Sequence, residues 1–201
     1  MFVHVLSPVT DDSSTLRPPF PDDAQLATRL RAGDVQALEQ LFRAMHEPLV
    51  VFALRYLGDR ARAEEQVQEL FFTVWNERDR LALSGSLRSY LFAAMRNKAL
   101  NVRRRDAVEQ DWADDEAQES VRQLHRQPET PDSLLESEEL QRIVNDAFER
   151  LPERCRLAMH LRWREGLSYA EIAEVLGIGV KGVENQLARG LKAVRAMVGA
   201  T

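Results

Sequence analysis

The sequence predicts an all-α protein in which two helical modules are joined by an acidic, flexible linker. Apolar residues recur every three or four positions in two separate blocks, and no segment alternates long enough to predict a strand. The chain has 201 residues, of which 44% are hydrophobic and 29% charged, which suffices for one large or two small domains. The net charge of −5 is unevenly spread, because residues 106–139 hold 12 of the 32 acidic residues and only 2 of the 27 basic ones. We therefore expect a flexible tail (1–22), a helical module (23–105), an acidic linker (106–137) and a second helical module (138–198).

The first module is expected to contain helices separated by glycine and aspartate signals. Four prolines among Ser, Thr and Asp mark residues 1–22 as a tail. Gly33-Asp34 precedes a long helical pattern, which Pro48 should kink or divide into two helices. Gly58-Asp59 and the loop 84–86 precede two further helices. The apolar stripes of these three patterns are Leu38, Leu41, Phe42, Met45 and Leu49; Val67, Leu70, Phe71, Val74 and Trp75; and Leu87, Leu91, Ala94, Met95 and Val102.

The second module begins with helix-start signals. Ser133 and Glu136 have capping-box spacing, as have Ser168 and Glu171 further along the chain. Pro152 suits the first turn of a helix between them. These signals predict a run of short helices that leads into the last part of the chain.

Residues 167–195 have the pattern of a helix-turn-helix. Ala173 supplies the small residue where the helices cross, Gly177 tolerates the positive φ of the turn, and Val183 anchors the second helix. The opposite face of that helix combines amide and basic side chains, which suit base edges and phosphates in a major groove. A plain helical hairpin with solvated charges is the alternative. The candidate DNA-contacting residues are Lys181, Glu184, Asn185, Ala188, Arg189 and Lys192.

Other motifs and the composition exclude several classes of function. Glycines at 177, 179 and 182 match a dinucleotide-binding fingerprint, but a helical stretch precedes them where that motif requires a strand. A single cysteine, Cys155, excludes an internal disulfide and a cysteine-based zinc site, and we interpret it as a small core residue. No apolar run approaches the length of a membrane span, and the first twelve residues lack a secretory signal pattern. No histidine pair or clustered catalytic set is apparent, so we expect a cytoplasmic protein without metal, cofactor or enzymatic activity.

Three motifs together resemble a known family. AEEQVQELFFTVW (63–75) resembles region 2.2, and SLRSYLFAAMRNKALN (86–101) resembles regions 2.3 and 2.4, of the extracytoplasmic-function (ECF, group IV) sigma factors of bacterial RNA polymerase. LPERCR (151–156), followed by the helix-turn-helix, is similar to their region 4. The resemblance extends over residues 24–105 and 138–198 and implies a sigma factor of the sigma-seventy family.

The resemblance also implies partners and sites. Core RNA polymerase would be bound at its β′ clamp helices and β flap, promoter DNA at the −35 and −10 elements, and an anti-sigma factor would be a further partner. The last helix would read the −35 element. The −10 element, with a flipped base near the loop 83–88, would be bound by Arg88, Tyr90, Arg96, Asn97, Lys98, Asn101 and Arg104. The β′ clamp helices would be bound by Glu65, Gln68, Glu69 and Phe72.

Each implied site has an alternative. Phe72 could pack on the N-terminal helices of the chain, although a phenylalanine among acids and an amide is typical of a protein interface. The six basic residues in 84–105, a range without an acid, could form a solvated face. Gly179 and Gly182 stand where the family usually has serine and threonine, which removes hydroxyls that would cap the last helix. For the whole chain, the alternative is a stand-alone regulator with a helix-turn-helix similar to that of LuxR-type proteins.

The acidic linker favours joint action of the two modules. Its 32 residues could extend to about 100 Å. Two modules on such a tether can occupy distant sites at once and gain from effective concentration.

Overall fold

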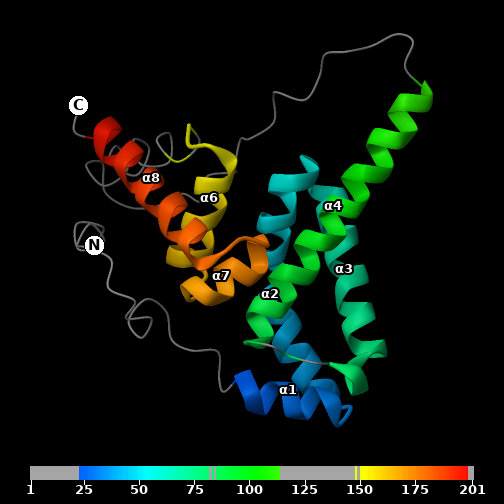
Figure 1. The fold of residues 1–201 in the computed structure, drawn as a ribbon. Helices are drawn as coiled ribbons and strands as arrows, with labels where there is room; N and C mark the ends of the chain where they lie inside the picture. The colour runs from blue at the N-terminus through cyan, green and yellow to red at the C-terminus, as the bar shows by residue number, and fades with distance from the viewer. Residues whose placement is uncertain (1–22, 82, 84, 114–147, 149, 199–201) are drawn as a thin grey trace, which may run out of the picture. The chain divides into compact units, whose positions relative to one another are not determined.

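The computed structural model describes residues 23–81, 83, 85–113, 148 and 150–198 (Figure 1). The chain divides into two compact units, one within residues 19–127 and the other mainly within 128–201. Every regular element in the described residues is helical, which confirms the predicted all-α class. The predicted tail, the capping box at Ser133 and most of the predicted linker lie outside the described residues.

The N-terminal unit is a bundle of three long helices with a short helix across one end (Figure 1). Its elements are α1 (Asp23–Arg31), α2 (Val35–Leu57), α3 (Arg60–Asn76), the 3₁₀ turn η2 (Arg78–Arg80) and α4 (Leu87–Ala113). All three long helices contribute fully buried side chains to one core, and Phe52 of α2 meets Phe92 of α4 edge-on with ring centroids 5.1 Å apart. Apolar burial on this scale is the main stabilisation of such a bundle.

Aspartate caps start two of these helices, as the sequence signals predict. The Asp34 side chain caps α2 by accepting hydrogen bonds from the backbone N–H groups of Gln36 and Ala37. The Asp59 side chain caps α3 by accepting a hydrogen bond from the backbone N–H group of Arg62. Arg29 of α1 donates to Asp34 at 2.8 Å. This hydrogen bond, together with those from the two backbone N–H groups, holds the pKa of Asp34 below its usual value.

The structure differs from the sequence predictions in three places. Pro48 does not divide α2, which is one helix from Val35 to Leu57. Phe42, predicted to belong to a buried stripe, is 38% exposed, and Trp75 is only half-buried. The helix α4 continues to Ala113 and so includes the first eight residues of the predicted linker, 106–113. Local pattern does not fix these features, because burial and helix length depend on what the neighbouring helices cover.

The described residues of the C-terminal unit include four helical segments from residue 153 onward. They are α6 (Glu153–Met159), the π-helical turn η3 (His160–Arg164), α7 (Tyr169–Leu176) and α8 (Val180–Val198). Pro152 lies at the N-cap of α6, one position before the first turn where we expected it. The unit's core combines Leu161 with Ile172 of α7 and Leu187 of α8, all of which are fully buried.

Buried polar groups organise the connection between η3 and α7. Arg162 is buried, donates to the Leu167 carbonyl at 3.1 Å, and lies over the Tyr169 ring. His160 and Glu165 form a second buried pair with 3.6 Å between Nε2 and Oε1. The contacts of Arg162 provide partners for a charge that would otherwise be costly to bury.

Cys155 belongs to the core of this unit. Its thiol is buried and donates to Oε1 of Gln186 on α8 at 3.0 Å. Burial raises the pKa of the thiol, which keeps it protonated near neutral pH. The position agrees with the interpretation of Cys155 as a small core residue.

Substitution by alanine at two glycines of α8 is expected to change the stability of the unit in opposite directions. A Cβ at Gly190 would lie 2.2 Å from Sδ of the buried Met159, whereas one at Gly182 would make only ordinary contact with Ile178. Gly182→Ala should stabilise the unit by about 0.5 kcal/mol through helix propensity. Gly190→Ala should be about 1–3 kcal/mol less stable than Gly182→Ala, because the core at that point is already filled. Hydrogen exchange of the α8 amides in the full-length variants measures the difference, and equal protection would contradict it.

Candidate nucleic-acid interface

The turn between α7 and α8 is built as the sequence predicts. Ser168 and Glu171 form a reciprocal capping box, and α7 ends at Gly177, whose φ of 62° is left-handed. The Ile178 N–H then donates to the Ala173 carbonyl at 3.0 Å, which closes the turn. The predicted helix-turn-helix is therefore present.

Backbone hydrogen bonds form the first turn of α8, the second helix of this motif. The Gly179 carbonyl accepts hydrogen bonds from the N–H groups of Gly182 and Val183, at 2.8 and 3.1 Å. Gly179 has no hydroxyl to cap the helix, so the first turn of α8 lacks the additional stabilisation that serine or threonine gives there.

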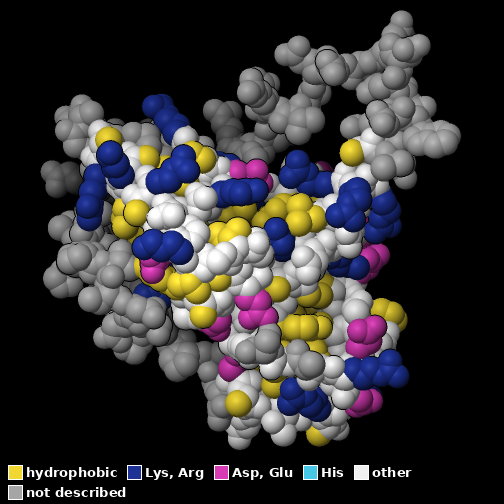
Figure 2. Space-filling model, in the orientation of Figure 1, with side chains coloured by type: hydrophobic (Ala, Val, Ile, Leu, Met, Phe, Trp, Pro, Cys, Tyr) yellow, Lys and Arg dark blue, Asp and Glu magenta, His cyan; other side chains and the backbone are white. Residues whose placement is uncertain are grey.

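One face of α8 is buried and the opposite face is exposed. Val183, Leu187, Leu191 and Val194 pack into the core of the unit. The predicted DNA-contacting residues lie on the other side: all are exposed except Glu184, which is half-buried. Dark blue Lys and Arg side chains gather along α8 in Figure 2.

An ion pair lies at the start of this exposed face. Nζ of Lys181 is 2.7 Å from Oε2 of Glu184, and this hydrogen bond raises the pKa of Lys181. The ammonium is thus positively charged at neutral pH and partly neutralised by its neighbour. Asn185 and Lys192 lie on the same exposed face.

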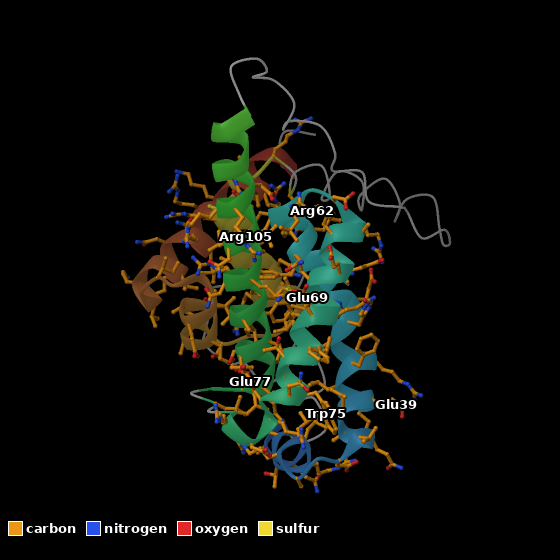
Figure 3. The ribbon with its side chains drawn as sticks, turned by 90° about the vertical axis from the view of Figure 1, so that its right-hand side faces the viewer. Glu39, Arg62, Glu69, Trp75, Glu77 and Arg105 are labelled. Atoms are coloured by element: carbon orange, nitrogen blue, oxygen red, sulfur yellow. The ribbon has the colours of Figure 1, made fainter. Side chains whose placement is uncertain are left out.

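A second polar face lies along α4. Asn97, Asn101 and Arg104 are exposed on it, while Tyr90 is half-buried near its start. Burial, and then the charge of Glu77 at the end of α3, raise the pKa of Tyr90, so its hydroxyl is protonated at neutral pH (Figure 3). Arg88 and Arg96 are half-buried on the same helix. The arrangement combines amides, a ring and arginines on one helix, as single-stranded DNA binding requires.

One basic residue of α4, Lys98, has an acidic partner on a neighbouring helix. Nζ of Lys98 lies 2.6 Å from Oε2 of Glu69 on α3, where the two helices are side by side (Figure 3). Local sequence pattern does not indicate this pair, because the acid comes from 29 positions earlier in the chain. The interpretation of the basic stretch as uncompensated is therefore wrong for Lys98.

The residues of the predicted protein interface lie on the outer face of α3. Glu65, Gln68, Glu69 and Phe72 are all exposed, and 69% of Phe72 is accessible. Phe72 therefore does not pack on the described helices of its own chain, which removes the alternative interpretation for those residues. An exposed phenylalanine with polar neighbours is typical of an interface centre.

Sequence analysis missed an aromatic residue beside this face. The Phe42 ring of α2 packs against Phe71 of α3 with centroids 4.9 Å apart and against His46 at 4.7 Å. Because Phe42 stays partly exposed, it adds apolar surface next to α3. Its helical spacing was compatible with a buried stripe, so only the packing of α2 against α3 reveals it.

The described residues hold neither a metal cluster nor a membrane-spanning helix. No group of three or more His, Cys, Asp or Glu side chains among them could hold a metal ion. Among these same residues, no helix is both long and apolar enough to cross a bilayer.

Comparison with known families assigns the class of protein that this fold and these faces define. Residues 41–109 match the family model described as Sigma-70 region 2, and residues 141–194 match Sigma-70, region 4. The ECF RNA polymerase sigma-E factor of Haemophilus influenzae is 30% identical over 83% of this chain and 90% of its own length. The sigma-E factor of Escherichia coli K12 is also 30% identical, over 86% and 92%.

The chain belongs to the sigma-70 family and, within it, to the ECF RNA polymerase sigma factors. Members of this family are transcription initiation factors rather than enzymes. The match to both region 2 and region 4 disfavours the alternative of a stand-alone LuxR-like regulator.

Two solved structures share the fold. One is the sigma factor RpoE of Bartonella quintana in complex with the anti-sigma factor NepR, with a TM-score of 0.62 and 23% identity over 82% of this chain and 98% of that one. The other is CnrH in complex with the cytosolic domain of CnrY, with a TM-score of 0.57 and 23% identity over 89% and 97%.

Proposed function

We propose that the chain directs core RNA polymerase to promoters with separate faces for the −35 element, the −10 element and the polymerase. The observation that best supports this proposal is that the face of α8 opposite its buried stripe is exposed and carries amide and basic side chains. Asn185 suits an adenine edge, and Lys181, Arg189 and Lys192 suit guanine or phosphate. Glu184 and Ala188 complete the face that enters the major groove.

The −10 element is assigned to α4. Its exposed Asn97 and Asn101 present donors and acceptors to bases that have left the duplex, and Tyr90 offers a ring for stacking. Arg88, Arg96 and Arg104 hold phosphates. Because Lys98 is paired with Glu69, its share of this contact is smaller than that of the exposed Arg104.

Polymerase binding is assigned to the outer face of α3. Phe72 forms its apolar centre, and Glu65, Gln68 and Glu69 surround it with polar groups. Phe42 extends the apolar area from α2. An aromatic centre with a polar rim is the composition of stable protein interfaces, and its partner here is the β′ clamp helices.

The remaining assignments follow from the same function. The two modules, residues 23–105 and 138–198, act together across the acidic linker, with the second also contacting the β flap. One structure of the same fold contains a sigma factor with an anti-sigma factor bound, and the other contains CnrH with the cytosolic domain of CnrY bound. We infer that this chain also takes an anti-sigma partner and works in the cytoplasm.

In vitro transcription tests the proposal. Purified chain is added to core polymerase that lacks any resident sigma factor, on a library of promoter fragments. New start sites are expected, sharing sequence elements near −35 and −10. Core polymerase alone is the negative control, and core with a housekeeping sigma factor shows which starts are specific to this chain. A regulator that needs a resident sigma factor gives no start sites without one, and that result would overturn the proposal.

A further inference from the structure

We propose that α1 braces the loop before α4, with Asp23 and Arg31 acting as positioning residues that set base preference within the −10 element. The inference rests on the proposed function, which assigns α4 and this loop to −10 DNA. It concerns residues outside every face described above.

Arg31 holds the beginning of the loop. Its guanidinium donates to the Leu81 carbonyl through Nε at 3.2 Å and Nη2 at 2.8 Å. Two donors on one carbonyl fix its direction as well as its position. The contact joins residues that are 50 positions apart in the sequence.

Asp23 holds the end of the loop. Its Oδ2 accepts a hydrogen bond from the Leu87 N–H, the first residue of α4, at 2.6 Å. The Ser86 hydroxyl accepts a hydrogen bond from the Ser89 N–H group at 3.1 Å. The first N–H groups of a helix have no partner within the helix, and a carboxylate there is also favoured by the helix dipole. Asp23 thus supplies α4 with a cap from a distant element.

The two contacts lie at opposite ends of α1. Asp23 and Arg31 are the first and last residues of that helix, which places them about 12 Å apart along its axis. The same rigid helix therefore sets the distance between the two ends of the loop. Loop residues between fixed ends sample fewer conformations, which favours binding of one base over another.

A hollow lies between the brace and the loop. It has a volume of about 440 Å³, within the range typical of small-ligand pockets. Its walls combine α1, including Asp23 and Arg31, with Leu83, Gly85, Ser86 and Leu87 from the loop and the start of α4. A flipped base requires a pocket of fixed shape, and α1 provides one side of this one.

The brace is separable from the attachment of α1 to the bundle. Leu26, Ala27 and Leu30 bury the apolar side of α1, and Arg29 ties its end to Asp34 and Gln40. Replacing Asp23 or Arg31 removes contacts to the loop but none of these. The helix is therefore expected to stay in place while the loop loses its fixed ends.

Binding selection on partly single-stranded DNA tests the inference. Holoenzyme with the full chain is equilibrated with fork DNA that carries a duplex −35 region and a randomised single-stranded −10 segment, and bound DNA is sequenced. Asp23→Ala and Arg31→Ala are expected to lower base discrimination at one or more −10 positions by about tenfold, the effect of losing a hydrogen bond to a charged group. In a parallel binding measurement with intact and scrambled −35 duplexes, the preference for the intact −35 element should be unchanged. Asp23→Asn, which keeps the acceptor oxygen, should restore most of the discrimination.

Arg29→Ala is the matched control, because it removes an α1 arginine whose hydrogen bonds do not reach the loop. Equal losses in Arg29→Ala and Arg31→Ala would overturn the inference, since they would reflect general weakening of α1. Unchanged −10 preference in both Asp23→Ala and Arg31→Ala would overturn it as well, and would leave the proposed function intact. If the unmodified holoenzyme shows no −10 preference, the assignment of α4 itself fails. Thermal unfolding of each variant checks the fold, and Arg31→Lys provides a second conservative variant.

Discussion

Changing Gln68 and Phe72 to lysine is expected to stop the chain from co-purifying with core RNA polymerase. Phe72 is 69% exposed in the free chain, so its burial against a partner would supply binding free energy. Full burial of a phenylalanine is worth roughly 1.5–3 kcal/mol. A lysine in its place loses that contribution and adds a charge that must be desolvated. Affinity should fall at least about 100-fold, measured by pull-down and by titration of labelled chain with core.

The control for this pair is Asp79→Lys on η2. It changes the charge by the same two units at an exposed position of the same unit, beyond the C-terminal end of α3 and outside the proposed interface residues. Its affinity for core should stay close to that of the unmodified chain. Continued co-purification of the Gln68 and Phe72 double variant would place the polymerase interface elsewhere. Loss of binding in Asp79→Lys as well would show that net charge, not the α3 face, controls binding.

Replacing Lys181, Asn185 and Lys192 with alanine is expected to abolish −35-dependent transcription while polymerase binding persists. All three side chains are exposed, so their loss leaves the core of the C-terminal unit unchanged. Each base-edge contact removed costs roughly 1–3 kcal/mol, and each lost phosphate contact lowers the salt dependence of binding by about one unit of slope. Together these losses predict a decrease in promoter output of about 100-fold or more.

The measurement compares two promoters that differ only in the −35 element. The unmodified chain should distinguish the intact from the scrambled element, and the triple variant should transcribe both equally weakly. Arg154→Ala, an exposed charge on α6 of the same unit, is the matched variant and should retain the distinction. If the triple variant keeps its preference for the intact element, this face of α8 does not read −35 DNA.

Sequence pattern predicted most of the elements because the signals involved are local. Asp34 caps α2, Ser168 and Glu171 form their capping box, and Gly177 adopts its left-handed turn, all through contacts within a few residues. The stripe of α8 is buried as its 3.6-residue period predicts. Periodicity also placed Phe72 on an exposed face.

Pattern misled where a residue's surroundings come from a distant part of the chain. Pro48 is tolerated inside α2, and Phe42 lies at the margin of the core rather than within it. Lys98 lies in a stretch without acids, yet Glu69 of the neighbouring helix pairs with it. Helical spacing gives the direction of a side chain but not the identity of what it meets.

The sequence by itself determined the helical class, the two modules, the helix-turn-helix and the family. The helical class and the helix-turn-helix follow from capping, turn chemistry and periodicity, which act within neighbouring residues, and the family follows from three such local motifs in their order along the chain. Only the tertiary structure decided that Arg31 and Asp23 hold the two ends of the loop before α4, over separations of 50 and 64 residues. Contacts of that kind form when helices pack, and the bundle geometry that brings them together is set by the whole core rather than by any single segment.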